Sequence, residues 1–201
     1  MRLCVIGDSP EVQRCAFTLV QQGHQVYWLL PPDALQMLPK GAAGLQEAPD
    51  LLPATCRSVV PVQTYHCEGI RLVCVNQECW QRPDLHTRLF TCLCLLQRDL
   101  PCAIFHAWGP LPIAYLTVYT ARFLDVPAVV SSLSAEPEQP FLWDWVARQA
   151  SAVIVPSRAE RERLLTFGPL TPTQVHVLDP MQLHLGQALT ALYARLGAAM
   201  S

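Results

Sequence analysis

His106 and Trp108 are the two side chains whose types and position point most directly to chemistry. They end an apolar run, residues 102–108 (CAIFHAW), directly before a helical segment. In open α/β sheets, ligands bind where the carboxyl ends of strands lead into helices. A histidine there can hydrogen-bond a polar ligand, and a tryptophan can stack on a sugar ring. We predict ligand contacts from both; the alternatives are that His106 bonds a loop carbonyl and that Trp108 packs under Pro110.

The turn after the first apolar run offers a second group of candidates, Gly7, Asp8 and Ser9. The run RLCVI stops at Gly7, and Pro10 and Glu11 open a helix after Ser9. A polar ligand could bind at this first strand-to-helix turn, although Ser9 is also the residue type that caps a helix N-terminus. Phosphate is a poor ligand for the turn, because Asp8 is negatively charged and Pro10 lacks an N–H group.

Other chemistries lack the residues that they need. The chain has no G-x-S-x-G elbow for a serine hydrolase and no G-x-G-x-x-G for a dinucleotide. Its nine cysteines form no C-x-x-C pair, and their alternation with aliphatic residues predicts buried, reduced thiols. Cys92 and Cys94 would point to different faces of a helix, which suits zinc poorly. Glu136 and Glu138 flank prolines and indicate a solvated loop. We expect no metal and no cofactor.

The composition indicates one soluble domain. The 201 residues are 51% hydrophobic with a formal net charge of -2, which provides a core but not the basic surface that binds nucleic acid. No apolar stretch approaches the ~20 residues that cross a bilayer, and the first apolar segment is too short for a signal peptide. We therefore expect a cytoplasmic protein with no nucleic-acid partner and no transmembrane segment.

Strand and helix patterns alternate along most of the chain. Residues 2–6, a helix with Val12, Cys15 and Leu19 on one face, and residues 24–30 form a β-α-β unit, which implies parallel pairing. Residues 56–67 and 70–76, separated by Glu68-Gly69, are expected to form a hairpin or two adjacent strands. The further expected elements are helix 85–100, strand 102–108, helix 110–124 with Ile113, Leu116, Thr120 and Phe123 buried, strand 126–133, helix 141–150, strand 151–157, a helix capped by Ser157, strand 174–179 and an amphipathic helix after Pro180. This alternation predicts an α/β fold with a single doubly wound, mostly parallel Rossmann-like sheet and helices on both faces.

Taken in order, these segments resemble the N-terminal, acceptor-side lobe of family 4 glycosyltransferases, whose GT-B fold has two Rossmann-like lobes. The likeness is carried by RLCVIGD with LVQQGHQVYWL, by CAIFHAWGPLPIAYLTVYTARFLDVPAVVSS, by ARQASAVIVPSRAERERLLTFG and by TQVHVLDP. The resemblance implies that residues 1–180 form the lobe and that His106 matches the family histidine that touches sugar or acceptor. Trp108 stands where the family often has a second histidine, which is a departure from its pattern.

The resemblance also implies that donor and acceptor bind to different lobes. Family enzymes bind the nucleotide sugar mainly through a C-terminal donor lobe, which residues 181–201 are too few to form. These residues resemble the final helix that packs back on the N-terminal lobe in complete enzymes; any amphipathic helix covering an exposed face is the alternative.

Three functions follow from this. The first is an acceptor-binding lobe, for a sugar or glycolipid, that works with a protein partner carrying the donor lobe. The second is a catalytically silent accessory or scaffold subunit of a larger complex, and the third is a small sugar- or nucleotide-binding module. We expect a glycosyltransferase-like domain that is inactive alone.

Overall fold

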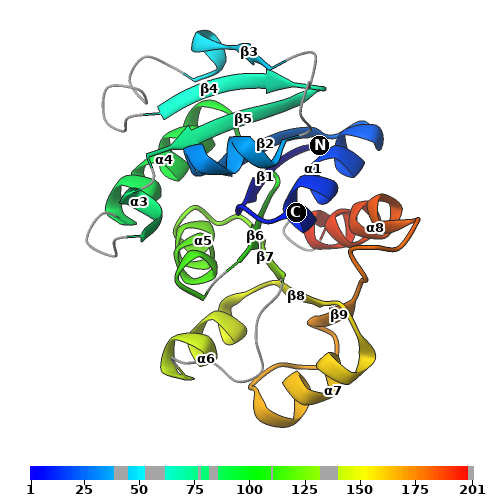
Figure 1. The fold of residues 1–201 in the computed structure, drawn as a ribbon. Coiled ribbons are helices and arrows are strands. Elements are labelled where there is room, and N and C mark those ends of the chain that lie inside the picture. The colour runs from blue at the N-terminus through cyan, green and yellow to red at the C-terminus, as the bar shows by residue number, and fades with distance from the viewer. Residues whose placement is uncertain are drawn as a thin grey trace.

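The computed structural model describes residues 1–38, 45–52, 62–76, 78–81, 86–109, 111–131 and 140–198, and these residues form one nine-stranded sheet (Figure 1). Its strands stand in the order β3-β4-β5-β2-β1-β6-β7-β8-β9. They are β1 (Arg2–Ile6), β2 (Gln25–Leu30), β3 (Gln46–Glu47), β4 (Val62–Cys67), β5 (Ile70–Val75), β6 (Ile104–Trp108), β7 (Ala128–Ser131), β8 (Ala152–Val155) and β9 (Val175–Val177). All neighbours pair in parallel except β3 with β4 and β4 with β5.

Helices cover both faces of the sheet. They are α1 (Pro10–Gln21), α3 (Glu78–Gln81), α4 (His86–Asp99), α5 (Leu111–Phe123), α6 (Pro140–Gln149), α7 (Arg158–Phe167) and α8 (Leu185–Ala198), with 3₁₀ turns η1 (Pro32–Met37) and η2 (Pro49–Leu51). Helices α4 to α7 share one core with the sheet, and α1 and α8 share the other. Figure 1 shows α1 and α8 on one side of the strands and α4, α5 and α6 on the opposite side. The predicted doubly wound α/β fold is therefore confirmed.

Two helix starts follow the local signals in the sequence. Ser9 precedes α1, and its Oγ accepts a hydrogen bond from the backbone N–H of Val12 at 3.4 Å. Ser157 precedes α7, and its Oγ accepts one from the backbone N–H of Glu160 at 3.2 Å. Both serines thus satisfy N–H groups that have no partner within the helix, and both predicted caps are confirmed.

The prediction that Phe123 is buried is wrong. Its side chain is 68% exposed, and Tyr119 one turn earlier is 45% exposed. The apolar face of α5 that meets the sheet is formed instead by residues such as Ile113 and Leu116. The sequence did not distinguish the buried face of α5 from the exposed face, because large apolar side chains occur on both and the pattern is only weakly amphipathic.

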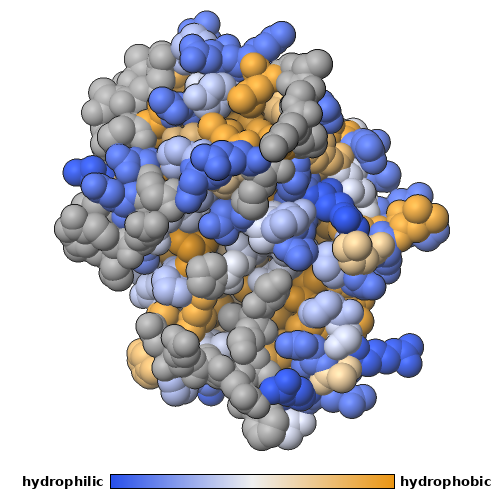
Figure 2. Space-filling model, in the orientation of Figure 1, coloured by the Kyte–Doolittle hydropathy of each residue, from blue (hydrophilic) through white to orange (hydrophobic). Residues whose placement is uncertain are grey.

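The described cysteines are not paired in disulfides; seven of them are buried and Cys94 is half-buried. Cys56, Pro110, Glu136 and Glu138 lie outside the described residues. On the face drawn in Figure 2, the coloured residues include both hydrophilic ones and patches of apolar ones.

Helix α8 lies against α1 and covers the part of the sheet that α1 leaves open. Its buried residues are Leu185, Gly186, Leu189, Leu192 and Tyr193, which share a core with Val129, Ala152 and Ile154 of the neighbouring strands. The contact is close, because a Cβ added to Gly186 would lie 2.4 Å from Cγ2 of Thr18 in α1. A side chain at Gly186 would therefore push the two helices apart.

Gly186→Ala should lower the free energy of unfolding by about 1–2 kcal/mol, since the cost of overpacking exceeds the gain in helix propensity. Gly197→Ala in the same helix is the matched control, because a Cβ there meets no atom within 4 Å. That variant should be neutral or up to about 1 kcal/mol more stable. Urea unfolding of both variants measures the difference, and equal stabilities would contradict the close α1–α8 contact.

Candidate functional site

A pocket of about 220 Å³ lies at the carboxyl ends of strands β6 to β9, beside the first turn of α1. It is lined by Glu11, Trp108, Ser131, Ile154, Val155, Pro156, Leu178 and Pro180. The carboxyl ends of parallel strands share one edge of the sheet, where open α/β folds bind ligands. The lining combines one carboxylate and one hydroxyl with an apolar wall, and this mixture is typical of small-molecule sites.

His106 lies beneath this pocket and is only 1% exposed. Its Nδ1 is 2.6 Å from the hydroxyl of Tyr193 in α8, and its Nε2 is 2.7 Å from Oγ of Ser131. Burial lowers the pKa of His106 from 6.5 to about 3, so the imidazole is neutral at physiological pH. A histidine with that pKa is a poor general base. It is placed to orient Ser131, which does line the pocket.

Trp108 lines the pocket with little of its ring, because the residue is only 3% exposed. Its ring centroid is 5.2 Å from that of His106, and its Nε1 is 3.4 Å from His106 Nδ1. The tryptophan is therefore held mainly by packing and supplies an apolar floor, while extensive stacking on a ligand would need it to move.

Gly7 directly follows β1 and packs against the end of β6. Its φ of +148° is one that residues with a side chain rarely adopt, and a Cβ there would lie 2.2 Å from the carbonyl oxygen of Trp108. The carbonyl of Gly7 also accepts a hydrogen bond from Nε1 of Trp28 at 2.8 Å. The glycine thus permits close packing between strand ends.

The N-terminus of α1 is occupied by the chain's own carboxylate. Ser9 caps the helix and hydrogen-bonds Glu11, and this bond is the largest cause of the lowered pKa of Glu11. Asp8 is exposed beside them. Neither Asp8 nor Ser9 lines the pocket, whereas Glu11 does. Negative charge at a helix N-terminus is stabilised by the helix dipole, so Glu11 takes the place that an anionic ligand would need.

Sequence reasoning missed Glu11, Ser131 and Tyr193. Glu11 was read only as a residue of the first helical turn. Ser131 is the polar last residue of an apolar strand, and the register pairs it with Trp108 of β6. Tyr193 is a polar-tipped residue in the leucine-rich terminal helix, 87 positions from His106. Each departs from its local apolar pattern, and that departure was the available signal. The contact between them and His106 depends on the tertiary fold.

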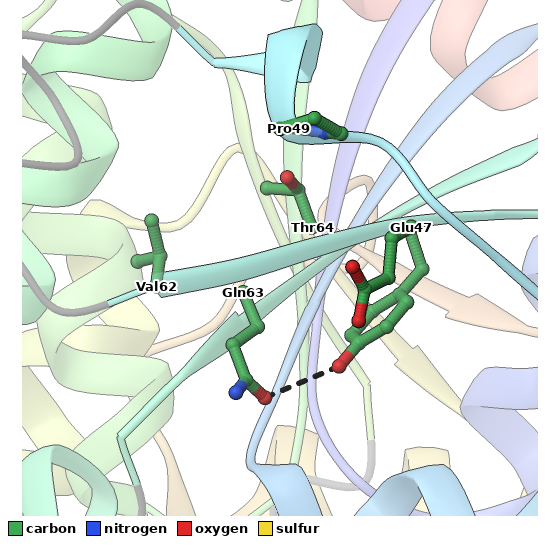
Figure 3. A pocket seen from close by; sticks show the side chains of 6 residues that line it. Glu47, Pro49, Val62, Gln63 and Thr64 are labelled. Atoms are coloured by element: carbon green, nitrogen blue, oxygen red, sulfur yellow. Dashed lines mark hydrogen bonds between the residues drawn. The ribbon is translucent and has the colours of Figure 1, made fainter.

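A second hollow of about 240 Å³ lies at the other end of the sheet, on β4 near β3 (Figure 3). Glu47, Pro49, Val62, Gln63, Thr64 and Tyr65 line it. Its polar groups bond within the protein: Tyr65 donates to Oε1 of Gln63 at 3.2 Å, and Thr64 donates to the carbonyl of Ala48 at 2.6 Å. Three strands separate β4 from β6, so this hollow is distinct from the pocket at Ser131.

Within the described part of the chain, no three His, Cys, Asp or Glu side chains gather as a metal site would require. None of the described helices has the length and apolar character needed to span a membrane.

The chain belongs to glycosyltransferase family 4, because the model of that family matches residues 12–180. No curated protein matches it. Among solved structures, the sucrose-phosphate synthase of Thermosynechococcus elongatus, in the form designated 27_220_406_426, is similar with a TM-score of 0.61 and 10% identity, and each chain is fully covered by the other.

Two longer structures share the fold over part of their length. UDP-N-acetylglucosamine 2-epimerase from Rickettsia bellii has a TM-score of 0.59 and 8% identity, over 96% of this chain and 47% of that one. Arabidopsis thaliana UGT89C1 complexed with UDP has a TM-score of 0.58 and 11% identity, over 97% of this chain and 56% of that one. The chain thus spans about half the length of these structures, and its fold is one Rossmann-like lobe of a GT-B protein.

The buried His106 should make the fold sensitive to acid. Its folded pKa of about 3 is below its usual 6.5, so the unfolded chain binds a proton that the folded chain does not. Stability contributed by the neutral imidazole is complete above pH 6.5 and falls by about 1.4 kcal/mol per pH unit between pH 6.5 and 3.

Unfolding free energies of wild type and His106→Gln from pH 7 to 4 test this expectation. Glutamine keeps a hydrogen-bond donor and an acceptor but does not titrate. The unfolding free energy of His106→Gln should therefore change less steeply with pH than that of wild type, by nearly 1.4 kcal/mol per pH unit. Equal slopes for wild type and His106→Gln would contradict the assigned burial.

Proposed function

We propose that this family 4 domain is an acceptor-binding lobe that holds a neutral sugar, or the sugar headgroup of a glycolipid, in the pocket at Ser131. The observation that carries the proposal is the pairing of Glu11 and Ser131 in one pocket with an apolar wall. A sugar hydroxyl can donate to the Glu11 carboxylate, a neighbouring oxygen can accept from Ser131, and the C–H face of the ring can meet Ile154 and Pro156.

Size and charge both disfavour a nucleotide sugar in this pocket. Its volume of about 220 Å³ is below the roughly 300–1,000 Å³ of sites for drug-sized ligands, so it suits a single ring. The first turn of α1 already carries the carboxylate of Glu11, with Asp8 exposed beside it. Two carboxylates repel a diphosphate at the helix end that would otherwise attract it.

The donor-binding lobe, in this proposal, lies outside these 201 residues and is supplied by a protein partner, so the domain is inactive alone. The chain's coverage of about half of the epimerase structure supports this division. The described cysteines are thiols rather than disulfides, which supports a cytoplasmic location.

An accessory role in a larger complex is favoured by a strip of aromatic rings across α4, α5 and α6. Phe90 lies 5.5 Å from Phe123 and 5.8 Å from Tyr119, and Tyr115 lies 6.0 Å from Tyr119 and 4.9 Å from Trp145, as ring centroids. Exposed aromatic residues are common where proteins bind other proteins. The strip lies away from the sugar pocket, so both roles are compatible.

Saturation-transfer NMR with methyl α-D-glucopyranoside, methyl α-D-mannopyranoside and methyl β-D-galactopyranoside tests the pocket. At least one glycoside should bind, UDP should not, and Glu11→Gln and Ser131→Ala should each weaken binding about three- to tenfold, as expected for one hydrogen bond. Glu47→Gln, in the hollow on β4, is the control and should bind normally. If wild-type protein binds UDP and none of the three glycosides, the pocket is a nucleotide site and the proposed sugar-binding function is wrong.

Affinity capture of the tagged protein from its native lysate, with mass spectrometry of the retained chains, tests the partner. A retained chain with a donor lobe should restore transfer, and His106→Ala in the reconstituted pair should reduce it because Ser131 loses its orienting partner. Capture that depends on Phe123 and Tyr119, with no donor lobe retained, would favour the accessory role and exclude the acceptor lobe of a split enzyme.

A further inference from the structure

A chain of hydrogen bonds runs through the protein interior from helix α8 to the pocket. The hydroxyl of Tyr193 is 2.6 Å from His106 Nδ1, and His106 Nε2 is 2.7 Å from Oγ of Ser131. Each of these three residues is 1% exposed. His106 and Tyr193 do not line the pocket, so their hydrogen bonds are made within the protein and the direction of each is fixed by its neighbours.

Trp108 sets that direction. Its indole N–H can only donate, and it approaches His106 Nδ1 at 3.4 Å, so Nδ1 carries a lone pair. The hydroxyl of Tyr193 must then donate to Nδ1 as well. Since the buried imidazole is neutral, its single proton is on Nε2 and is donated to Ser131.

Ser131 is the last member of this chain and the only one of the three that lines the pocket. Its Oγ accepts from His106, so its own O–H is free to donate. Among the described residues, no group accepts that O–H. The nearest use for it is an oxygen of a ligand in the pocket.

We propose that Tyr193 is a positioning residue that, through His106, fixes Ser131 as a hydrogen-bond donor to an acceptor oxygen of a neutral sugar. This inference rests on the proposed sugar-binding function and adds a role for α8, none of whose residues lines the pocket. The terminal helix then determines the polarity of the site from a distance, and the ligand needs an oxygen lone pair facing Ser131 and a hydroxyl facing Glu11.

The tautomer of His106 in the unliganded protein tests the relay by itself. Long-range ¹H–¹⁵N correlation NMR of the imidazole should show a proton on Nε2 and none on Nδ1 in wild type. In Tyr193→Phe, which removes only the hydroxyl, the Nδ1 resonance should shift because its principal donor is lost. A proton on Nδ1 in wild type would overturn the relay whether or not any sugar binds.

Titration with the three methyl glycosides named above tests the link to the ligand. Tyr193→Phe should weaken the bound glycoside about three- to tenfold, close to the effect of Ser131→Ala, and the double variant should lose little more. Thr190→Val is the matched control, because it removes another α8 hydrogen bond to a histidine, the 2.8 Å contact with Nε2 of His24. That variant should bind normally.

Equal losses in Tyr193→Phe and Thr190→Val would show that α8 acts through general packing and would overturn the positioning role. An Nε2–H tautomer with no glycoside bound would leave the relay intact but overturn the proposed function and the ligand inference together. His106→Gln, which can donate to Ser131 and accept from Tyr193, should retain more affinity than His106→Leu.

Discussion

A parallel sheet has two apolar faces, and both must be covered for it to fold. In this chain helices α4 to α7 cover one face, whereas the other receives only α1 and the terminal α8. Without α8, the strands that carry Val129 and Ile154 would expose that face to water. The packing of α8 on α1, which Gly186 permits, is therefore the contact on which the lobe depends as an independent unit.

The same packing determines what the site can do. By bringing Tyr193 over His106, α8 removes from solvent the histidine that the family resemblance links to the ligand. Burial keeps the imidazole neutral, and its hydrogen bond orients the hydroxyl of Ser131. At the neighbouring strand end, Glu11 fills the positive end of α1. The carboxylate of Glu11 makes this edge of the sheet a poor site for an anion.

The sequence predicted the fold better than the site. The β-α-β start, the hairpin around Glu68-Gly69 and the caps at Ser9 and Ser157 depend on residues close in the chain, and all appear in the structure. The burial of Phe123 was predicted wrongly because both faces of α5 are apolar, and only tertiary packing decides which meets the sheet. His106 was selected for its position at a strand end. Its partners lie 25 and 87 residues away, so their identity required the fold.

The energetics of the buried polar groups connect stability with binding. Each buried donor or acceptor left unpaired costs about 1–3 kcal/mol, and the chain of hydrogen bonds satisfies Tyr193 and both nitrogens of His106. At the pocket wall, Ser131 is the member of this chain through which the network reaches the pocket. In the proposed function, a sugar oxygen accepts the Ser131 O–H and extends the network to the ligand. Glu11 is the ionisable group among the lining residues, and its lowered pKa makes it a hydrogen-bond acceptor more than a proton acceptor. In the proposed function, these groups hold a hydroxyl-bearing ring in one orientation.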